Sequence, residues 1–327
     1  MKKVYLIIGA IVIVIIGLFL FFKLKNDSLE DVLTKAKRNN KYELVCDMEM
    51  VQNDELKSYE VKVDFLKQQK QKYYRVELYD KSLNQAQIII KNQEGVFVLT
   101  PTLNQIFKFQ SQWPENSPKP YIYSSLLSVL EKNKATKTKD GYQVEGKVKY
   151  PNDQRIVKEE IIFDKKLNPQ RITCLDKDET ELIIVKVKEF HTNKTIKLSY
   201  FDEEKALKEA KEASQSSVSN DILYPVALMG SSLDSETVST IEGDKNHILR
   251  FTGDKNYTIV ESQEINQDAV VNVIDEEVVD LVDGFAYYCQ GKLSMVNSGI
   301  FCSIYSHDLT KEEMISIMTS MQSSTTK

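Results

Sequence analysis

Glycine and histidine are scarce in this chain. Its 327 residues include 11 glycines, well under the roughly 7% usual in proteins, and 3 histidines that lie far apart. Glycine-rich loops that cradle phosphates, and histidine clusters that bind metals or act as general bases, are therefore not expected. The sequence also lacks the zinc-protease, dithiol, serine-hydrolase and phosphate-loop motifs. We expect no catalytic residues, no metal, no cofactor and no enzyme activity.

Charge is divided unevenly along the chain. Residues 222–327 hold 16 acidic against 6 basic residues, a net charge of −10, whereas residues 1–221 carry +5 that is spread thinly. Nucleic-acid binding needs a concentrated basic face, so that class of function is not expected. With 42% hydrophobic and 28% charged residues the chain is globular, and its length suits two domains better than one.

The first 25 residues read as a membrane anchor. Val4–Phe22 is a run of nineteen uncharged residues, which as a helix would span about 30 Å, the thickness of the hydrocarbon core. Two lysines precede the run on a very short tail, which favours an inside N-terminus. A cleaved signal peptide would end in small residues, whereas Leu18–Phe22 is bulky throughout. We expect a single-pass anchor in the cytoplasmic membrane, with the bulk of the chain extracytoplasmic.

Four cysteines would then lie in an external compartment. Cys46, Cys174, Cys289 and Cys302 allow three pairings, but all four sit in strand-like apolar runs. A hairpin turning at residues 297–299 would place Cys302 opposite Ser294 and not opposite Cys289. Buried free thiols are the favoured interpretation, and the pairing itself stays open.

Helical periodicity gives way to strand periodicity after about residue 40. Ser28 can cap a helix reaching about Asn39, with Leu33 in its apolar stripe. From Leu44 to Phe109 the apolar residues recur with period two, separated by short turns that are typical of antiparallel hairpins. This alternation predicts a meander of strands.

A second helix interrupts the strands. Prolines 114, 118 and 120 end the first set, and Leu126 and Leu130 share one face of a helix that follows. Strands resume after Gly141 and continue to about Val187. About ten antiparallel strands in one sheet must curl, and the two amphipathic helices are the cover expected for its inner face. Residues 26–200 therefore predict an α+β domain, a curved half-barrel sheet with a helical lid.

The remainder of the chain predicts a second domain. Residues 201–221 read as a highly charged helix, Asp202–Ala213, and a serine-rich linker. Residues 222–327 hold further strands and a last helix that Thr310 and Glu313 can cap as a box. The methionines of that last helix have the spacing of a buried stripe. A small C-terminal α+β domain is expected.

The first domain resembles a known superfamily. The run Tyr73–Phe109, with Arg75, Gly95 and Pro101 in order, is similar to the lipoprotein-carrier superfamily that contains LolA, LolB and RseB. Trp113 and the helix after it resemble more narrowly the YdcC and GerS branch of spore-forming bacteria. Residues 222–327 are similar to a small domain of unknown function that accompanies such modules.

The resemblance implies a curved antiparallel sheet around a hydrophobic cavity that helices close. In the alternating strands the residues expected to line that cavity are Met48, Met50, Val63, Phe65, Tyr74, Val76 and Phe97. The expected lid residues are Leu33, Leu126 and Leu130. The alternative interpretation is that all of these side chains are core and leave no cavity.

The resemblance also implies a function. We expect a membrane-anchored, non-catalytic binding protein of the cell envelope that acts in sporulation or germination. It would bind an apolar ligand, a lipoprotein-like chain, or an envelope protein such as a cell-wall amidase or a membrane regulator. A tethered chain cannot shuttle between membranes, so lipoprotein transport is not expected. The alternative function is that of an RseB-like sensor, whose acidic second domain grips a membrane signalling protein.

Overall fold

The computed structural model describes residues 28–52, 55–115, 118–213, 222–241, 244–262 and 270–323. The chain divides into two units, residues 1–39 and 40–327. The first unit contains helix α2, Leu29–Lys37. Its N-cap is the predicted Ser28, whose hydroxyl accepts from the backbone N–H of Asp31 while the Asp31 carboxylate accepts from the backbone N–H of Ser28. Within the described ranges no helix is long and apolar enough to cross a membrane, and the expected anchor at residues 4–22 lies outside them.

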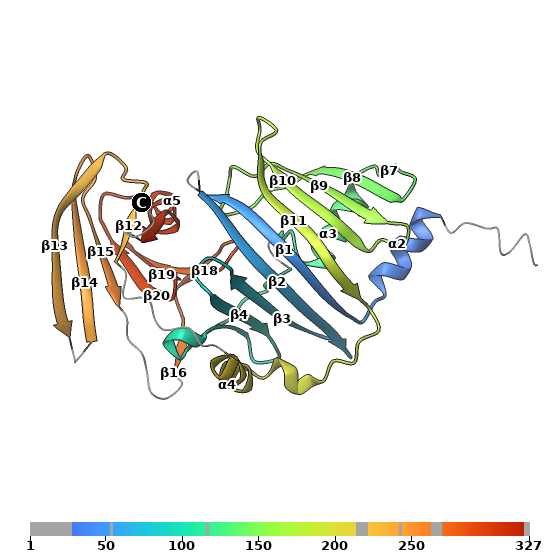
Figure 1. Cartoon of the computed structure of the whole chain (residues 1–327), viewed down its shortest axis with the longest axis horizontal. Coiled ribbons are helices and arrows are strands. Elements are labelled where there is room, and N and C mark those ends of the chain that lie inside the picture. The colour runs from blue at the N-terminus through green and yellow to red at the C-terminus, as the bar shows by residue number, and fades with distance from the viewer. Residues whose placement is uncertain are drawn as a thin grey trace, which may run out of the picture. The chain divides into compact units, whose positions relative to one another are not determined.

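The second unit is built on a large, curved, twelve-stranded sheet (Figure 1). The strand order is β16-β6-β5-β4-β3-β2-β1-β11-β10-β9-β8-β7, and β16 pairs with β6 in parallel whereas the other neighbours are antiparallel. The bounds are β1 Lys41–Gln52, β2 Glu55–Gln68, β3 Gln71–Asp80, β4 Gln85–Lys91, β5 Val96–Thr100, β6 Gln105–Phe109, β7 Thr136–Lys137, β8 Gly141–Lys147, β9 Lys158–Asp164, β10 Pro169–Leu175, β11 Glu181–His191 and β16 Val270–Val273. The predicted antiparallel meander is confirmed, and the parallel edge strand from beyond residue 222 was not foreseen.

The register gives the sheet one almost wholly apolar face, which we call the inner face. Leu44 on β1 lies opposite Val63 on β2, and Val63 lies opposite Val76 on β3. On the other side of β1, Met48 lies opposite Val185 of β11. All of these side chains have no exposed surface. Because side chains alternate between faces with period two, this continuous row is what the alternating sequence predicted.

Helix α3, Tyr123–Lys132, is one cover of the inner face. Leu126 and Leu130 are buried on it, at 0% and 3% exposure, as expected for the second helix. The helix contacts β8, where a Cβ on Gly146 would lie 2.7 Å from Val129 Cγ1 and 2.5 Å from Asn133 Nδ2. A glycine at this position therefore lets α3 approach the strand more closely than any larger residue would allow.

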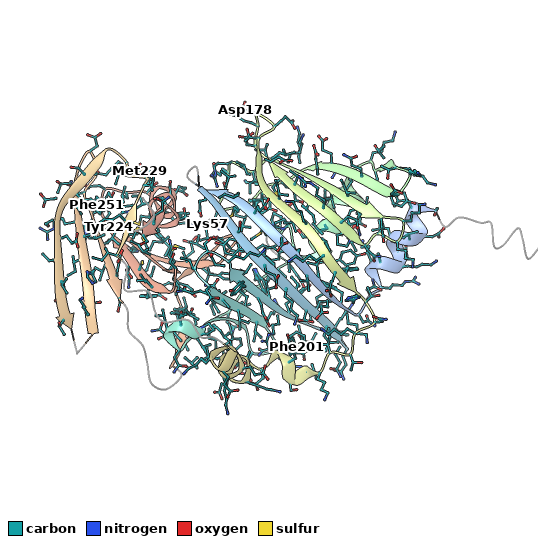
Figure 2. The ribbon with its side chains drawn as sticks, in the orientation of Figure 1. Lys57, Asp178, Phe201, Tyr224, Met229 and Phe251 are labelled. Atoms are coloured by element: carbon teal, nitrogen blue, oxygen red, sulfur yellow. The ribbon has the colours of Figure 1, made fainter. Side chains whose placement is uncertain are left out.

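The opposite, outer face of the sheet is also covered. The 3₁₀ helix η2, Leu198–Phe201, and helix α4, Glu203–Ala213, follow β11 (Figure 1), and Phe201 lies in that segment (Figure 2). Phe201, Ala206 and Leu207 form a buried cluster with outer-face residues of β3 to β6. Arg75 stacks on the Tyr200 ring, with its guanidinium carbon 4.2 Å from the ring centroid. The charged helix predicted at residues 202–213 is therefore packed on the sheet through Ala206 and Leu207.

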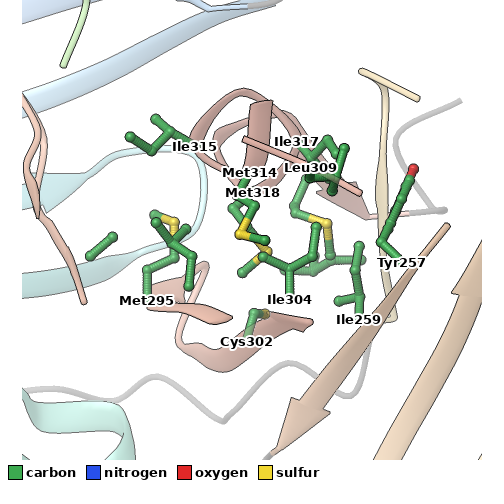
Figure 3. Close-up of a cluster of buried hydrophobic side chains, with 14 of the residues drawn as sticks. Tyr257, Ile259, Met295, Cys302, Ile304, Leu309, Met314, Ile315, Ile317 and Met318 are labelled. Atoms are coloured by element: carbon green, nitrogen blue, oxygen red, sulfur yellow. The ribbon is translucent and has the colours of Figure 1, made fainter. Parts of the chain in front are cut away.

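A second sheet follows in the same unit. Its order is β13-β14-β15-β20-β19-β18-β17, and a short pair β12-β21 lies apart from it. The bounds are β12 Leu223–Pro225, β13 Ser231–Ile241, β14 Asp244–Gly253, β15 Tyr257–Ser262, β17 Glu277–Asp280, β18 Phe285–Cys289, β19 Lys292–Asn297, β20 Ile300–Tyr305 and β21 Met321–Ser323. Helix α5, Lys311–Thr319, has the predicted Thr310 and Glu313 capping box. Met314 and Met318 lie in the buried cluster that α5 forms with this sheet (Figure 3), so the methionine stripe is core.

Residues from the second sheet complete the cover of the first. The Trp113 ring lies 6.1 Å from that of Tyr74 on the inner face and 6.0 Å from that of Phe285 on β18. Tyr121 donates from its hydroxyl to the Val282 carbonyl at 2.7 Å. Lys119, 1% exposed, donates to Asp280 Oδ1 at 2.7 Å and to the Leu281 carbonyl. These contacts bring residues about 160 positions apart in the sequence into one core.

One polar cluster lies among the apolar residues of the inner face. Glu159 on β9 is fully buried, its Oε1 accepts from the Tyr150 hydroxyl, and its Oε2 has no partner among the described residues. Burial raises the pKa of Glu159 to about 7, against which the hydrogen bond from Tyr150 acts to lower it. Glu159 is therefore protonated in the folded protein at pH values where an exposed glutamate is charged.

Removing the buried ammonium of Lys119 is expected to destabilise the protein. Lys119→Met leaves the Asp280 carboxylate, whose side chain is 12% exposed and whose Oδ2 is buried, without its counter-charge, and the free energy of unfolding should fall by about 3 kcal/mol. Urea denaturation measures the loss. The control is Lys177→Met beside Asp178, in the β10–β11 turn (Figure 2), where the ion pair is exposed and the change should stay within about 0.5 kcal/mol. A loss for Lys119→Met below about 1 kcal/mol would contradict the role of this pair.

The buried Glu159 predicts a pH-dependent stability. The pKa of Glu159 is higher in the folded than in the unfolded chain. Its protonated form therefore contributes to the free energy of unfolding in full below the unfolded pKa of about 4.5, and this contribution is lost as pH rises through about 7. Glu159→Gln keeps a neutral side chain at every pH, so its free energy of unfolding should rise relative to that of the wild type by about 2.5 kcal/mol between pH 5 and pH 8. Urea midpoints across that range test this. The control Glu212→Gln on α4 should show the same pH dependence of the urea midpoint as the wild type. If Glu159→Gln also showed the pH dependence of the wild type, the assignment of the raised pKa to Glu159 would be wrong.

Candidate functional site

Six of the seven residues expected to line a cavity share the inner face. In register, Phe65 lies opposite Tyr74, Val63 opposite Val76, and Met48 opposite Tyr59. Met50 continues the same row along β1. Their exposures lie between 0% and 7%. The alternation in the sequence therefore located this face correctly, and whether any of these residues binds a ligand stays a prediction.

Phe97 is the exception, and its expected direction is wrong. It lies opposite Ile90 on β4, which in turn lies opposite Arg75 and not Tyr74. Since adjacent residues of a strand point to opposite faces, Phe97 is on the outer face, where it belongs to the same buried cluster as Leu207 of α4. Phe97 therefore cannot line a cavity that Tyr74 lines.

The expected lid residues divide between the two units. Leu126 and Leu130 lie on α3 and are buried within the second unit. Leu33 lies on α2 in the first unit, so its part in a lid stays a prediction. Tyr123 at the start of α3 donates from its hydroxyl to the Leu167 carbonyl at 2.9 Å, which ties the helix to the turn before β10. This hydrogen bond fixes α3 over the sheet.

Aromatic rings take up space over the inner face. Tyr42 and Phe65 have ring centroids 5.1 Å apart, Phe65 and Tyr74 4.8 Å, and Tyr74 and Trp113 6.1 Å. Burial raises the pKa of the Tyr74 hydroxyl to about 12. Rings at these distances are in van der Waals contact, so side chains of the chain itself occupy this part of the inner face.

The hollows at the rim of the sheet are polar. A pocket of about 320 Å³ is lined by Met50, Tyr150 and Asp280 together with Ile315 of α5. Among the predicted ligand-binding residues Met50 alone lines it, and Asp280 Oδ2 within it is buried without a partner in the described residues. A carboxylate with an unsatisfied oxygen makes this pocket a poor site for an apolar chain.

A smaller neighbouring pocket of about 100 Å³ is also lined with oxygen atoms. Thr100 Oγ1 and Gln87 Oε1 are buried there without partners in the described part of the chain. Asp283 accepts from the Tyr59 hydroxyl at 3.0 Å, and burial raises the pKa of Asp80 above its ordinary value. Unsatisfied oxygens around a volume of this size suit a few water molecules.

The thiols have the expected chemistry with one correction. All four cysteines are free, and Cys46, Cys174 and Cys302 are buried. Cys302 lies opposite Met295, one residue from the predicted partner Ser294, and it is not opposite Cys289. Cys289 is exposed because it is the last residue of β18, where the strand turns into Gly291. Burial raises the pKa of Cys46, so this thiol stays neutral and unreactive.

The described residues hold one group with the spacing of a metal site. Glu43, Glu189 and His191 bring their ligand atoms within 4.8 Å of one another. The Glu43 carboxylate already forms an ion pair with the Lys194 ammonium group, and Lys62 Nζ lies 3.8 Å from the same carboxylate oxygen. Two ammonium groups neutralise the charge that a cation would need, so this group is an ion-pair network of the outer face.

A feature that sequence reasoning missed is a basic groove beside β8. This groove, which we call the β8 groove, has a volume of about 830 Å³ between α3, the residues that follow Trp113, and β8. Its lining lysines are Lys72, Lys132, Lys147, Lys149 and Lys158. The signal in the sequence is the pair Lys147 and Lys149 at period two, which in a strand places both on one side.

The comparisons with known proteins agree with the resemblance. No family model matches. The chain is 29% identical over 318 residues to a protein named sporulation protein YdcC from Bacillus subtilis strain 168, covering 93% of this chain and 92% of that protein.

Three solved structures are similar to this chain at low TM-scores. One is an uncharacterized conserved protein from Thermus thermophilus, with TM-score 0.36, 14% identity, and 54% of this chain and 93% of that chain covered. Another is the MucA/MucB complex of Pseudomonas aeruginosa, with TM-score 0.31, 13% identity, and coverage of 89% and 96%. A third is a putative outer membrane lipoprotein-sorting protein domain from Vibrio parahaemolyticus, with TM-score 0.31, 12% identity, and coverage of 54% and 97%.

The resemblance to the YdcC-type branch is confirmed by the sequence similarity to the Bacillus subtilis protein, which runs over nearly the whole chain.

Proposed function

We propose that this chain is a non-catalytic binding protein of the cell envelope that serves sporulation by holding a protein partner. The role in sporulation is supported by the similarity to a protein named for sporulation over 93% of the chain. The anchor expected at residues 4–22 would hold the two sheets outside the cytoplasmic membrane. The chain would then present its surfaces to other envelope proteins from a fixed position.

The observation that carries the choice of a protein partner is the filled inner face. Trp113 is 1% exposed, Leu126 is 0% exposed, and Val76 on the inner face is 0% exposed. An apolar ligand would have to displace α3, which Tyr123 and Gly146 hold close to the sheet. Such a displacement would expose several buried leucine-sized side chains, each worth roughly 1.5–3 kcal/mol of burial. Binding on the outside of the sheets avoids that cost.

The alternative function is the envelope sensor that regulates a membrane signalling protein. Photo-crosslinking in cells from Val238 on β13, 54% exposed, separates the two functions. Capture of a membrane signalling protein would favour the sensor, whereas capture of cell-wall enzymes would favour the scaffold.

The filled inner face predicts a large cost for shortening Leu126. In a packed core, Leu126→Ala should lower the free energy of unfolding by about 2–5 kcal/mol, because it leaves a cavity that the neighbours cannot close. Urea denaturation of the full chain in non-ionic detergent measures this. Leu198→Ala on η2, where the side chain is 45% exposed, is the matched control with a cost below about 1 kcal/mol. A cost for Leu126→Ala as small as the control's would mean that α3 is a loose lid over an open cavity.

The proposed location predicts an anchored chain with its C-terminus outside the membrane. A peptide tag after Lys327 should be removed by protease added to intact protoplasts, while a cytoplasmic marker survives. Deleting residues 4–22 should prevent membrane association, because the anchor is the expected hydrophobic span. A tag that stays protected until the protoplasts are lysed would reject the outside location.

A further inference from the structure

The edge of the large sheet at β8 is open along most of its length. Strand β7 has two residues, and it pairs with β8 at Tyr142 and Gln143 alone. Beyond Gln143, no described strand pairs with this edge of β8, although the opposite edge is paired with β9 as far as Lys147. An edge of this kind carries N–H and C=O groups that a further strand can pair with.

The residues whose backbone groups face the open edge follow from the pairing. Val148 donates from its N–H to Val157, so it faces β9. Gly141 accepts from the N–H of Thr138, so it faces the β7 side. In an antiparallel ladder both backbone groups of a residue point to one side, and successive residues alternate. Glu145 and Lys147 therefore direct their N–H and C=O groups to the open edge.

This edge lies along the β8 groove. Residues 145–149 line one wall, and Ser124, Ser128 and Lys132 of α3 line another. The volume of about 830 Å³ accommodates several residues of an extended chain. Ser124 is exposed and Ser128 is half-buried, so their hydroxyl groups add hydrogen-bonding capacity beside the open strand edge.

The groove has an excess of positive charge. Lys72 pairs with Glu115 at 2.8 Å, and Lys158 pairs with Glu145 at 3.4 Å while it also contacts Glu160 and Glu179. Each of the two carboxylates of the lining therefore has an ammonium partner. Lys132, Lys147 and Lys149 also line the groove, and no carboxylate among the described residues pairs with them. Three unmatched ammonium groups beside an open strand edge select an acidic occupant.

We propose that the β8 groove binds an acidic peptide segment of a partner protein, in extended conformation, as an added strand on β8. The backbone of Glu145 and Lys147 pairs with the peptide backbone, as in other cases of strand addition. Lys132, Lys147 and Lys149 bind its carboxylates. The inference rests on the proposed function, because it names the chemical class of the protein partner that the chain holds.

Three peptides test the proposal by fluorescence anisotropy with the full chain in non-ionic detergent. The first is a labelled octapeptide of alternating threonine and glutamate, the second replaces glutamate by lysine, and the third replaces every threonine of the acidic peptide by proline. The acidic threonine peptide should bind at least tenfold more tightly than either of the others. Its affinity should fall with added salt, because ion pairs at an exposed groove are screened.

Variants separate charge from strand pairing. Lys147→Glu with Lys149→Glu should weaken binding at least tenfold, whereas Lys165→Glu with Lys166→Glu in the β9–β10 turn makes the same charge change elsewhere and should have little effect. Lys147→Thr removes one charge and keeps the N–H that faces the edge. Lys147→Pro removes the N–H as well, and because this N–H lies on the unpaired side the ladder with β9 is retained. Lys147→Pro should bind at least fivefold more weakly than Lys147→Thr.

Hydrogen exchange gives the location. On adding the acidic peptide, the segment 141–149 should exchange more slowly than before, and urea midpoints should show that every variant is folded. The proposal is overturned if Lys147→Pro binds like Lys147→Thr, since the groove would then be a general anion site that also takes polyphosphate or anionic vesicles. It is also overturned if the basic peptide binds equally well or if protection appears elsewhere. The cost of Leu126→Ala is measured separately, so failure here leaves the filled inner face unaffected.

Discussion

The constraint on which this structure depends is the burial of a wide apolar sheet face. Twelve strands present a continuous inner row that includes Leu44, Val63 and Val76, and each of these is fully withdrawn from water. Two short helices cannot cover that area. The sheet is covered by α3, by the segment around Trp113 and by residues of the second sheet such as Phe285. The hydrophobic effect thus joins parts of the chain that the sequence separates widely.

The polar groups that accompany this burial are placed where the parts meet. Lys119 pairs with Asp280 and with a backbone carbonyl, so a charge that burial would penalise is held between the two sheets. On the outer face, Arg75 and Tyr200 place the segment that leads into α4. Ionic contacts of this kind add specificity of position to an interior whose stability is mainly apolar. The surfaces that remain for a partner are therefore edges and grooves rather than the centre of the sheet.

Much of the fold follows from the sequence, for physical reasons that particular residues show. Alternation along β1 to β3 located the inner face because those strands are apolar on one side and polar on the other. Ser28 and Thr310 marked the starts of two helices because their hydroxyl groups accept hydrogen bonds from backbone N–H groups. The direction of Phe97 was wrong because β4 and β5 are apolar on both faces, so Ile88 to Ile90 carry no alternation. The β8 groove was missed because an unpaired edge is a property of the whole sheet. No local pattern identifies the parallel partner of β6 either, since pairing between distant segments depends on tertiary structure.

The parallel pairing of β16 with β6 has a consequence for biosynthesis. Residues 270–273 complete the edge of the first sheet, yet strands β13, β14 and β15 of the second sheet precede them along the chain. During synthesis from the N-terminus, roughly 160 residues must therefore emerge after β6 before β16 can pair with that edge. During this interval β6 remains a bare template for pairing with other molecules. Under the proposed extracytoplasmic location, the exposed edge of β6 would have to be shielded on the outer side of the membrane until residues 270–273 have crossed.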